Sequence, residues 1–439
     1  MNCNLDKAIV CIVGLGYVGL DLARAFSKRL RVIGFDIDNA KIVQLNQQTC
    51  STIPNESIEL LTPATQLQQN LSFTANPKDI GKADFIIITV PTPVTSAKEP
   101  DLSCVRSAAK IVGDNMHRDS IVIVESTVYP TVTEEIVKPI LERESRLTCG
   151  TDFKIAYSPE RVNPGDEVHS IDKIVKVVAA MDRETTDLVA RLYQKVTPSI
   201  FKAKDIRTAE AAKVIENIQR DLNIALMNEI ALILDKMNLS TKDVLDAAAT
   251  KWNFNHYLPG LVGGHCIPVD PYYLVSKAKE LGYYPQVILA GRAINEYMPK
   301  HVAQLAIRAL NEVGKIIKSS KTLIMGLTYK ENVADIRESP VKGIIEELKG
   351  YGTEIIGFDP LLSPHEFEGK FNINLLRTLE EAEKVKVDCI IIAVAHLSFH
   401  NLTLSRLKEL QNDNPILIDV RRIFDAEKAK DVGFLYKSL

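Results

Sequence analysis

Short apolar runs that stop at glycine, proline or acidic residues recur in both halves of the chain. "KAIVCIVGLG", "RVIGFDID", "ADFIIITVPTP" and "SIVIVESTVYP" lie within the first 200 residues, and "KTLIMGLTYK", "TEIIGFDP", "VDCIIIAVAH" and "PILIDVRRIFD" follow after residue 316. Such runs are typical of strands buried on both faces, and the helical stretches between them indicate βαβ units. The pattern predicts an α/β protein with two Rossmann-like, doubly wound parallel-sheet domains.

The middle of the chain follows a different pattern. Residues 205–238 contain no Gly or Pro, and their apolar residues recur at helical spacing. A single helix of this length would span about 50 Å, so we expect it to cross between domains or subunits. Ser240 and Asp243 then resemble a capping box that opens the next helix. We therefore predict three domains, 1–204, 205–300 and 301–439, of which the middle one is helical.

The composition excludes several classes of protein. A net charge of −3 over 439 residues gives no basic footprint for nucleic acid. No apolar run reaches about 18 residues, so no membrane span is expected, and the start of the chain shows no signal peptide. The seven cysteines form no CxxC or His/Cys metal spacing. We expect a cytoplasmic protein with reduced thiols and no metal site.

The first apolar run leads into a GxGxxG motif formed by Gly14, Leu15, Gly16, Tyr17, Val18 and Gly19. The motif follows a strand and opens a helix, and Asp36 ends the next strand about 20 residues later. This context predicts a dinucleotide site with the pyrophosphate at the helix N-terminus. Asp36 would bind the ribose hydroxyls and repel a 2′-phosphate, which favours NAD over NADP. Lys41 either reaches this end of the site or is a solvated lysine.

Several polar residues follow the predicted strands. Thr92 in "TVPTP" and Thr127 in "ESTV" are candidates for cofactor or substrate contacts, or they cap turns. Glu160 and Arg161 lie between prolines in "YSPERVNPGD", either in a site loop or in a surface ion-pair loop.

Two further features carry possible chemistry. Lys213, Asn217 and Arg220 are spaced i, i+4 and i+7 on one face of the long helix, which is either a basic site or solvated surface. Cys266 lies in "LVGGHCIPVD" and is either a buried thiol or a nucleophile. A thiolate adds to an aldehyde, and oxidation of that adduct gives a thioester that water opens to a carboxylate. Asp270 could orient the water.

The motifs "VGLGYVG", "VPTP", "ESTV", "SPERVNPGD", "EAAKVIENIQRDLNIALMNE", "GGHCIPVDPYYL" and "GLTYKENVADIRESP" occur in this order over nearly the whole chain. The set resembles the UDP-glucose/GDP-mannose dehydrogenase family, and "SPERVNPGD" and "KWNFNHYLPGLVGGHC" are most similar to its UDP-N-acetylhexosamine branch. The resemblance implies NAD-dependent, four-electron oxidation of the sugar C6 alcohol to the acid, for surface polysaccharide synthesis. It also implies NAD on the N-terminal domain, a UDP-sugar on the C-terminal domain and a homodimer through the central helix.

The resemblance also implies roles for individual residues. Cys266 resembles the nucleophile and Lys213 the general base or oxyanion stabiliser, with Asn217 and Asp270 in support. Glu160 is similar to a glutamate near the hydrolytic step, and Thr127 to a threonine at the cofactor and water site. The other matches are Arg161, Val162, Arg220, Tyr257, Gly263, Lys330 and Arg421 for the nucleotide-sugar, and Tyr17, Val18 and Arg337 for NAD.

Two positions depart from the family pattern. Pro164 replaces a second glutamate of the UDP-glucose enzymes, and Leu258 replaces a cation common in close N-acetylhexosamine relatives. UDP-GlcNAc and UDP-GalNAc are the favoured substrates. UDP-ManNAc, UDP-glucose or GDP-mannose oxidation, a two-electron β-hydroxyacid dehydrogenase and a non-enzymatic NAD-sensing protein are the alternatives.

Overall fold

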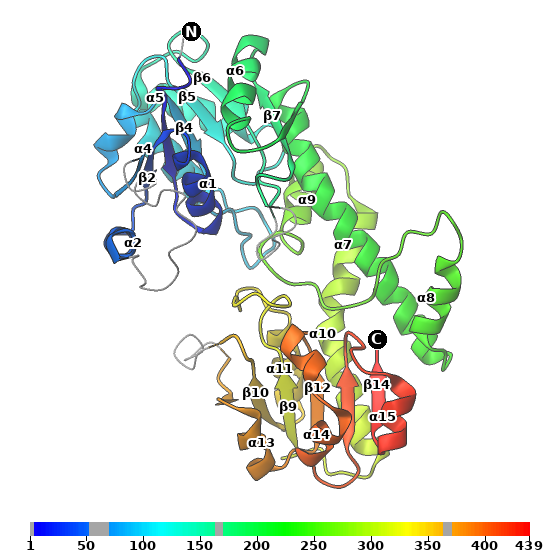
Figure 1. Ribbon diagram of the computed structural model, residues 1–439. Helices are drawn as coiled ribbons and strands as arrows, with labels where there is room; N and C mark the ends of the chain where they lie inside the picture. The colour runs from blue at the N-terminus through cyan, green and yellow to red at the C-terminus, as the bar shows by residue number, and fades with distance from the viewer. Residues whose placement is uncertain (1–3, 52–69, 163–169, 363–370) are drawn as a thin grey trace. The chain divides into compact units, whose positions relative to one another are not determined.

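The computed structural model describes residues 4–51, 70–162, 170–362 and 371–439. The chain divides into two compact units, and Figure 1 colours it from blue to red along its length. The first unit is Met1–Glu216 with Val269–Tyr284, and the second is Asn217–Pro268 with Pro285–Leu439. Residues of the predicted middle domain, 205–300, are therefore shared between the two units, and the three-domain division stays a prediction.

The described part of the first unit is built on an eight-stranded sheet in the order β3-β2-β1-β4-β5-β6-β7-β8. Its strands are β1 (Ile9–Val13), β2 (Arg31–Phe35), β3 (Leu71–Thr74), β4 (Phe85–Ile88), β5 (Ile121–Val124), β6 (Lys154–Tyr157), β7 (Val175–Ala180) and β8 (Ser199–Lys202). The first six strands are parallel and follow the order of a Rossmann fold. The carboxyl ends of β1, β2, β4 and β5 therefore share one edge of the sheet.

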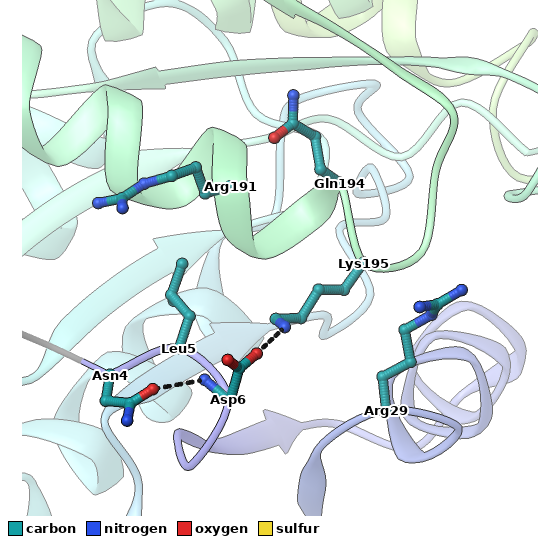
Figure 2. Close-up of a pocket in the computed structure, with 7 residues that line it drawn as sticks. All are labelled: Asn4, Leu5, Asp6, Arg29, Arg191, Gln194 and Lys195. Carbon is teal, nitrogen blue, oxygen red and sulfur yellow. Dashed lines mark hydrogen bonds and ion pairs between the residues drawn. The ribbon is translucent and has the colours of Figure 1, made fainter.

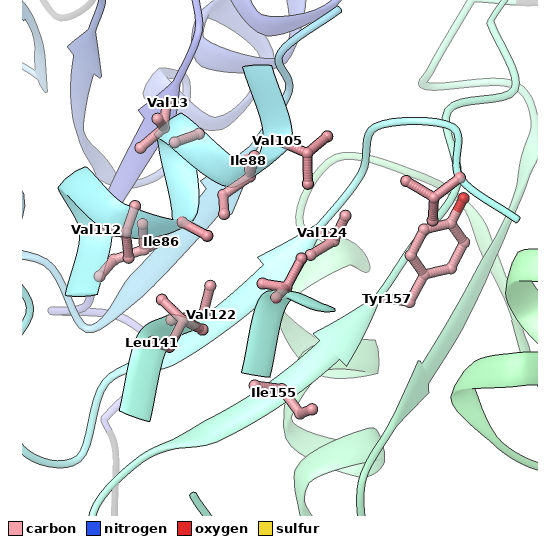
Figure 3. Close-up of a cluster of buried hydrophobic side chains, with 14 of the residues drawn as sticks. Val13, Ile86, Ile88, Val105, Val112, Val122, Val124, Leu141, Ile155 and Tyr157 are labelled. Atoms are coloured by element: carbon pink, nitrogen blue, oxygen red, sulfur yellow. The ribbon is translucent and has the colours of Figure 1, made fainter. Parts of the chain in front are cut away.

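Helices cover both faces of this sheet. They are α1 (Tyr17–Ser27), α2 (Asn39–Ser51), α4 (Ser103–Asn115), α5 (Lys138–Ser145), α6 (Arg183–Tyr193) and α9 (Asp270–Glu280), with the turns η1 (Pro77–Lys82) and η2 (Thr133–Val137). On one face, Val105 of α4 packs near Ile88, and Leu141 of α5 packs near Val122 (Figure 3). α1 and α6 supply the core on the other face. Burial from both sides explains why β4 and β5 are apolar throughout.

The described part of the second unit holds a six-stranded, fully parallel sheet in the order β11-β10-β9-β12-β13-β14. The strands are β9 (Lys321–Met325), β10 (Glu354–Phe358), β11 (Asn374–Leu376), β12 (Cys389–Ile392), β13 (Ile416–Asp419) and β14 (Leu435–Ser438). The helices are α8 (Thr241–Ala249), α10 (Gln286–Glu312), α11 (Val341–Gly350), α13 (Leu379–Val385), α14 (Leu404–Glu409) and α15 (Ala426–Val432), with the turn η3 (Leu397–Asn401). α10 and α11 pack on one face, and α13, α14 and α15 pack on the other.

The long helix predicted over 205–238 is α7 (Ile206–Lys236), with 31 residues. It begins in the first unit and continues into the second. Ser240 then caps α8, since its side chain accepts a hydrogen bond from the Asp243 N–H at 3.3 Å. The Ser240 half of the predicted capping box is thus present.

The prediction of two doubly wound sheets is confirmed, with one difference in detail. β7 runs antiparallel to β6, so the first sheet is mixed. The sequence gives little sign of this because the buried strand "VKVVAA" has the same apolar pattern in either direction. β3, β6, β7, β8, β11 and β14 were not predicted as strands; all of them except β7 have only three or four residues, with polar positions among them.

Candidate active site

A different structural feature explains each glycine of the GxGxxG motif. Gly14 has a φ of +98°, which disfavours any residue with a Cβ. A Cβ at Gly19 would lie 1.9 Å from the Gly14 carbonyl oxygen, so only glycine lets α1 pack this closely on the turn. Gly16 is the N-cap of α1, and a Cβ there would meet nothing within 4 Å. Open space therefore lies beside the helix N-terminus, where a dinucleotide pyrophosphate would bind.

Asp36 follows β2 at the same edge. Its Oδ2 accepts hydrogen bonds from the Leu15 N–H at 2.9 Å and from Lys41 Nζ at 2.8 Å, and its Oδ1 accepts one from the Asp38 N–H at 3.0 Å. Burial pushes the pKa of Asp36 upward, but these hydrogen bonds outweigh burial and the pKa lies below its usual value. The residue is thus an ionised acceptor tied to the glycine turn. Lys41 does reach this end of the sheet.

Thr92 and Thr127 follow β4 and β5, the neighbours of β1 on this edge. Both are half-buried. Tyr273 of α9 also lies here, because its hydroxyl donates to the carbonyl of Pro93, the residue after Thr92, at 3.3 Å. Tyr17 and Val18 open α1, and Tyr17 is 40% exposed. The first unit therefore gathers all predicted cofactor residues except Arg337 at one edge of its sheet.

The Glu160 loop adjoins a buried charge cluster that sequence reasoning missed. Glu125 accepts hydrogen bonds from Lys176 and, at 2.6 Å, from the Tyr193 hydroxyl, and all three side chains are fully buried. Burial raises the pKa of Glu125 to about 7, although Lys176 pulls it down. Glu160 Oε2 lies 4.0 Å from Lys176 Nζ, and its Oε1 accepts the Val162 N–H. The motif "ESTV" could have pointed to Glu125, whereas nothing in the sequence pointed to Lys176.

Arg161 is anchored rather than loose. Its Nη2 lies 2.8 Å from Glu216 Oε1 on α7, and its Nη1 donates to the Val175 carbonyl at 2.8 Å. Arg161 and Val162 are both half-buried. The predicted departure at Pro164 lies outside the described residues.

The three polar residues predicted to share one face of α7 differ in their exposure. Lys213 is 7% exposed, Asn217 is half-buried and Arg220 is exposed. Lys213 Nζ donates no hydrogen bond to another described residue. One turn earlier, buried Glu210 accepts the N–H groups of Thr131 at 2.6 Å and Thr133 at 2.9 Å. Glu210 thus ties the start of α7 to the segment after β5, a contact that the sequence did not predict.

Asp270 is the first residue of α9 and is 2% exposed. Burial raises the pKa values of the Tyr157 and Tyr273 phenols, and the nearby Asp270 carboxylate raises them further. The first unit therefore brings Asp270, Tyr157 and Tyr273 into one neighbourhood.

In the second unit, the loop that carries Cys266 packs on the segment that follows β9. A Cβ at Gly263 would lie 2.4 Å from Pro340 Cδ, and one at Gly264 would lie 2.7 Å from the Tyr329 ring. Gly264 also has a φ of +91°. Close packing against protein thus explains both glycines, and the assignment of Gly263 to the nucleotide-sugar stays a prediction. Cys266 is half-buried and close enough to Tyr329 to raise the pKa of its phenol, after burial.

Other predicted substrate residues, and Arg337, which was predicted to contact NAD, lie on the same unit. Arg337 forms a two-pronged pair with Asp335, with its Nη2 2.7 Å and its Nε 3.0 Å from the carboxylate. Tyr257 accepts a hydrogen bond from Gln219 Nε2 at 3.1 Å, and Leu258 beside it is 48% exposed. Arg421 Nε lies 3.2 Å from Glu331 Oε1. The second unit therefore brings Arg421 to the segment that carries Lys330.

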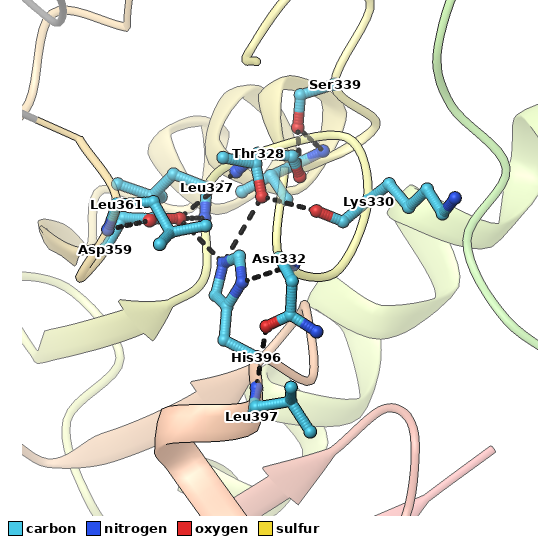
Figure 4. A network of polar contacts seen from close by, with 10 residues as sticks. Leu327, Thr328, Lys330, Asn332, Ser339, Asp359, Leu361, His396 and Leu397 are labelled. Carbon is cyan, nitrogen blue, oxygen red and sulfur yellow. Dashed lines mark hydrogen bonds and ion pairs between the residues drawn. The ribbon is translucent and has the colours of Figure 1, made fainter. Parts of the chain in front are cut away.

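A buried network shapes that segment (Figure 4). His396 Nδ1 accepts the Asn332 N–H at 3.0 Å, and its Nε2 lies 3.1 Å from Asp359 Oδ2. Asp359 Oδ2 also accepts the Leu327 N–H at 2.7 Å. Thr328 Oγ1 donates to the Lys330 carbonyl at 2.9 Å. These hydrogen bonds thus fix the backbone on both sides of Lys330. The sequence reasoning missed His396 and Asp359, although "IGFD" at 356–359 repeats 33–36.

Comparison with known proteins now decides the family. Three family models match: the NAD binding domain of the UDP-glucose/GDP-mannose dehydrogenase family over residues 8–197, its central domain over 207–297 and its UDP binding domain over 323–426. The chain belongs to this family. It is an NAD-dependent nucleotide-sugar dehydrogenase, so the predicted family, enzyme class and cofactor are confirmed.

Relatives of this dehydrogenase align over nearly its whole length. Protein CapL of Staphylococcus aureus is 45% identical over 95% of this chain and 97% of its own. A UDP-N-acetyl-D-glucosamine 6-dehydrogenase of Pseudomonas aeruginosa is 43% identical over 96% of this chain and 98% of its own. The solved structure of a UDP-D-ManNAc dehydrogenase from Pyrococcus horikoshii covers 98% of both chains with a TM-score of 0.84 and 30% identity.

A hollow on the first unit of the dehydrogenase lies away from this site. It has a volume of about 460 Å³ and is lined by Arg29, Arg191 and Lys195 among others, with Lys195 Nζ paired to Asp6 at 2.8 Å (Figure 2). These residues precede β1, β2 and β8, so the hollow lies at the amino ends of the strands. Ligands of open parallel sheets bind at the carboxyl ends.

No described helix is long and apolar enough to cross a membrane. No cluster of three or more His, Cys, Asp or Glu side chains that could hold a metal occurs among the described residues. Burial raises the pKa of the Cys149 thiol to about 11 and also raises the pKa values of Cys11 and Cys389, as expected for packing cysteines.

Proposed function

We propose that this dehydrogenase oxidises the C6 alcohol of a UDP-N-acetylhexosamine to the carboxylate, with UDP-GlcNAc or UDP-GalNAc as the favoured substrate. The observation that carries the proposal is the 43% identity, over nearly both full lengths, to an enzyme named UDP-N-acetyl-D-glucosamine 6-dehydrogenase. The Pyrococcus neighbour makes UDP-ManNAc the second candidate, at the lower identity of 30%.

The first unit fits NAD. Gly16 leaves open space at the N-terminus of α1, and Asp36 offers an ionised carboxylate at the end of β2. The helix end supplies backbone N–H groups for the pyrophosphate, and Asp36 supplies acceptors for the ribose hydroxyls. Tyr17, Val18, Lys41 and Thr92 would line the same cofactor. When bound, NAD accepts the two electrons and the hydrogen removed from the sugar carbon.

Lys213 is proposed as the base or oxyanion stabiliser. Its side chain is buried, and no described residue hydrogen-bonds its amine, so the amine remains available to a substrate oxygen. A buried lysine adapts readily to proton transfer. Asn217, one turn later, would share the same oxygen. Glu160, Thr127 and Asp270 are proposed to orient the water of the last step.

Cys266 is proposed as the nucleophile. Oxidation of the alcohol gives an aldehyde, and the Cys266 sulfur adds to its carbonyl carbon while the oxygen takes the proton, which forms a thiohemiacetal. A second two-electron oxidation gives a thioester. Water then attacks the thioester carbon, the carboxylate leaves and the thiol regains its proton. Two equivalents of NAD are consumed for each sugar.

The second unit is proposed to hold the UDP part of the substrate. The fixed backbone around Lys330 presents a cation on the segment after β9, with Arg421 beside it. Arg161, Val162, Arg220, Tyr257 and Gly263 are proposed as further substrate contacts. The proposal that Arg337 contacts NAD requires its guanidinium to serve the cofactor while it pairs with Asp335.

A homodimer through α7 is part of the proposal. Leu226 and Ile233 of α7 are 51% exposed and lie at i and i+7, on one side of the helix, and Met237, which directly follows α7, is 58% exposed. Large apolar side chains in a row on one helix face mark an interaction surface.

We also propose a cytoplasmic location and a role in surface polysaccharide synthesis. No disulfide joins the described cysteines.

One assay tests the reaction. Purified protein is given NAD with UDP-GlcNAc, UDP-GalNAc, UDP-ManNAc, UDP-glucose or GDP-mannose, and NADH is counted for each sugar consumed. We expect two NADH per acetylated UDP-sugar. Cys266→Ala should abolish acid formation, whereas Cys104→Ala, at another half-buried cysteine, should not. One NADH per sugar would contradict the thioester step, and no turnover of any acetylated sugar would contradict the substrate class.

A further inference from the structure

A chain of buried polar side chains runs from α10 through α7 to the loop that carries Cys266. Arg292 Nη1 donates to Asp221 Oδ1 at 2.6 Å, and Asn295 Nδ2 donates to the same oxygen at 2.8 Å. Asn228 Nδ2 then donates to Asn295 Oδ1 at 2.8 Å. All four residues are at most 3% exposed. Burying such groups is costly unless they are bonded, and each of the four side chains makes at least one hydrogen bond within this chain.

Asn228 ends this chain on the backbone of Gly260. Its Oδ1 accepts the Gly260 N–H at 2.8 Å, and its Nδ2 donates to the Gly260 carbonyl at 3.0 Å. One amide side chain thus holds both polar groups of a buried residue 32 positions away, as a neighbouring strand would. The Asn295 contact fixes which end of the amide is the donor.

The same loop is held a second time just before Cys266. The Gly264 N–H donates to the Glu338 carbonyl at 3.2 Å, and Gly264 sits against the Tyr329 ring. Three residues separate the two anchors, and Cys266 follows the second by two. The direction of the Cys266 side chain therefore depends on both anchors.

We propose that Asn228 is a positioning residue for Cys266, and that Arg292, Asp221 and Asn295 keep its amide in the required orientation. The inference rests on the proposed role of Cys266 as nucleophile. Apolar residues of similar volume often stabilise a core as well as a buried ion pair does. They could not hold the two polar groups of Gly260. A nucleophile must meet its carbon within a narrow range of positions, so a small shift of the loop lowers the rate steeply.

The test uses Asn228→Ala and Asn228→Gln in the full chain, with Asn223→Ala as the matched control. Asn223 lies on the same helix and donates only to the Gln219 carbonyl one turn away. We expect Asn228→Ala to lower kcat about 10- to 100-fold with the KM for NAD within about twofold of wild type. Asn228→Gln keeps the donor and acceptor and should restore part of kcat. Each kcat is measured well below the melting temperature of that variant.

A second readout does not depend on the substrate. Iodoacetamide labelling of Cys266, followed by mass spectrometry of its peptide, should be about tenfold faster in Asn228→Ala than in Asn223→Ala, because the loop opens more often. If Asn228→Ala does not fold, Asn228→Gln and Arg292→Lys are measured in the same two ways. A lower melting temperature with unchanged kcat and unchanged labelling would overturn the proposal. Changed labelling in a protein that oxidises no acetylated sugar would support the positioning role and contradict only the proposed substrate.

Discussion

The chain contains the same turn twice, once after β1 and once after β9. "IGFD" occurs at 33–36 and again at 356–359, and "GL-G-Y" after β1 corresponds to "GL-T-Y" after β9. Gly14 and Gly326 both have positive φ, and their N–H groups donate to Phe35 and Phe358 at 2.9 Å. In each unit the aspartate at the end of the second strand accepts the N–H of the leucine after this glycine.

The two turns differ in what closes them. After β1, Gly16 leaves open space and α1 begins at the next residue, so the proposed pyrophosphate site is formed by backbone N–H groups. After β9, Thr328 and His396 fill that place with side chains, and the next helix, α11, starts only at Val341. One copy therefore leaves its backbone open, as the proposed pyrophosphate site requires. The other is sealed and instead displays side chains such as Lys330 and Arg337.

The largest expected effect comes from closing the open turn. Gly19→Ala would place a methyl group 1.9 Å from the Gly14 carbonyl oxygen, and this clash with backbone cannot be relieved by a side-chain rotation. We expect NAD binding, measured by calorimetry, to weaken about 100-fold or more, since overpacking costs about 3 kcal/mol. UDP binding should be unchanged. Glu331 occupies the matching position after β9, so Glu331→Ala should leave NAD binding unaltered; near-normal NAD binding by Gly19→Ala would disprove the role of this close contact.

A smaller effect separates the two aspartates. Asp36→Asn should weaken NAD binding about tenfold and improve NADP relative to NAD, with UDP binding unchanged. Asp359→Asn should do the reverse, weakening UDP binding about tenfold and sparing NAD, because it loosens the backbone around Lys330. Calorimetric titration of each variant with NAD and with UDP measures both arms. Equal effects of either substitution on both ligands would mean that the two turns do not serve separate ligands.

The sequence allowed the first turn to be predicted much more fully than the second. The glycines and Asp36 follow each other within one βαβ unit, so short-range pattern sufficed. The His396 contact joins Asp359 to a residue 37 positions away, and Lys176 meets Glu125 across 51 positions. Such pairings depend on how strands and helices pack, which hydrophobic periodicity does not encode. The same limit hid the Asn228 contact with Gly260. The antiparallel β7 was missed because buried strands look alike in either direction.

The smallest effect concerns the outer partner of Asp36. Lys41 Nζ lies 2.8 Å from Asp36, but its side chain is 38% exposed, whereas His396 beside Asp359 is 1% exposed. A solvent-exposed ion pair contributes about 1 kcal/mol or less. Lys41→Gln should therefore lower NAD affinity no more than about fivefold, with Lys28→Gln as an exposed-lysine control. His396→Gln should cost more in UDP binding, because it leaves the Asn332 N–H and Asp359 without their buried partner. A Lys41 effect as large as that of His396 would show that the open turn depends on side chains as much as the sealed one does.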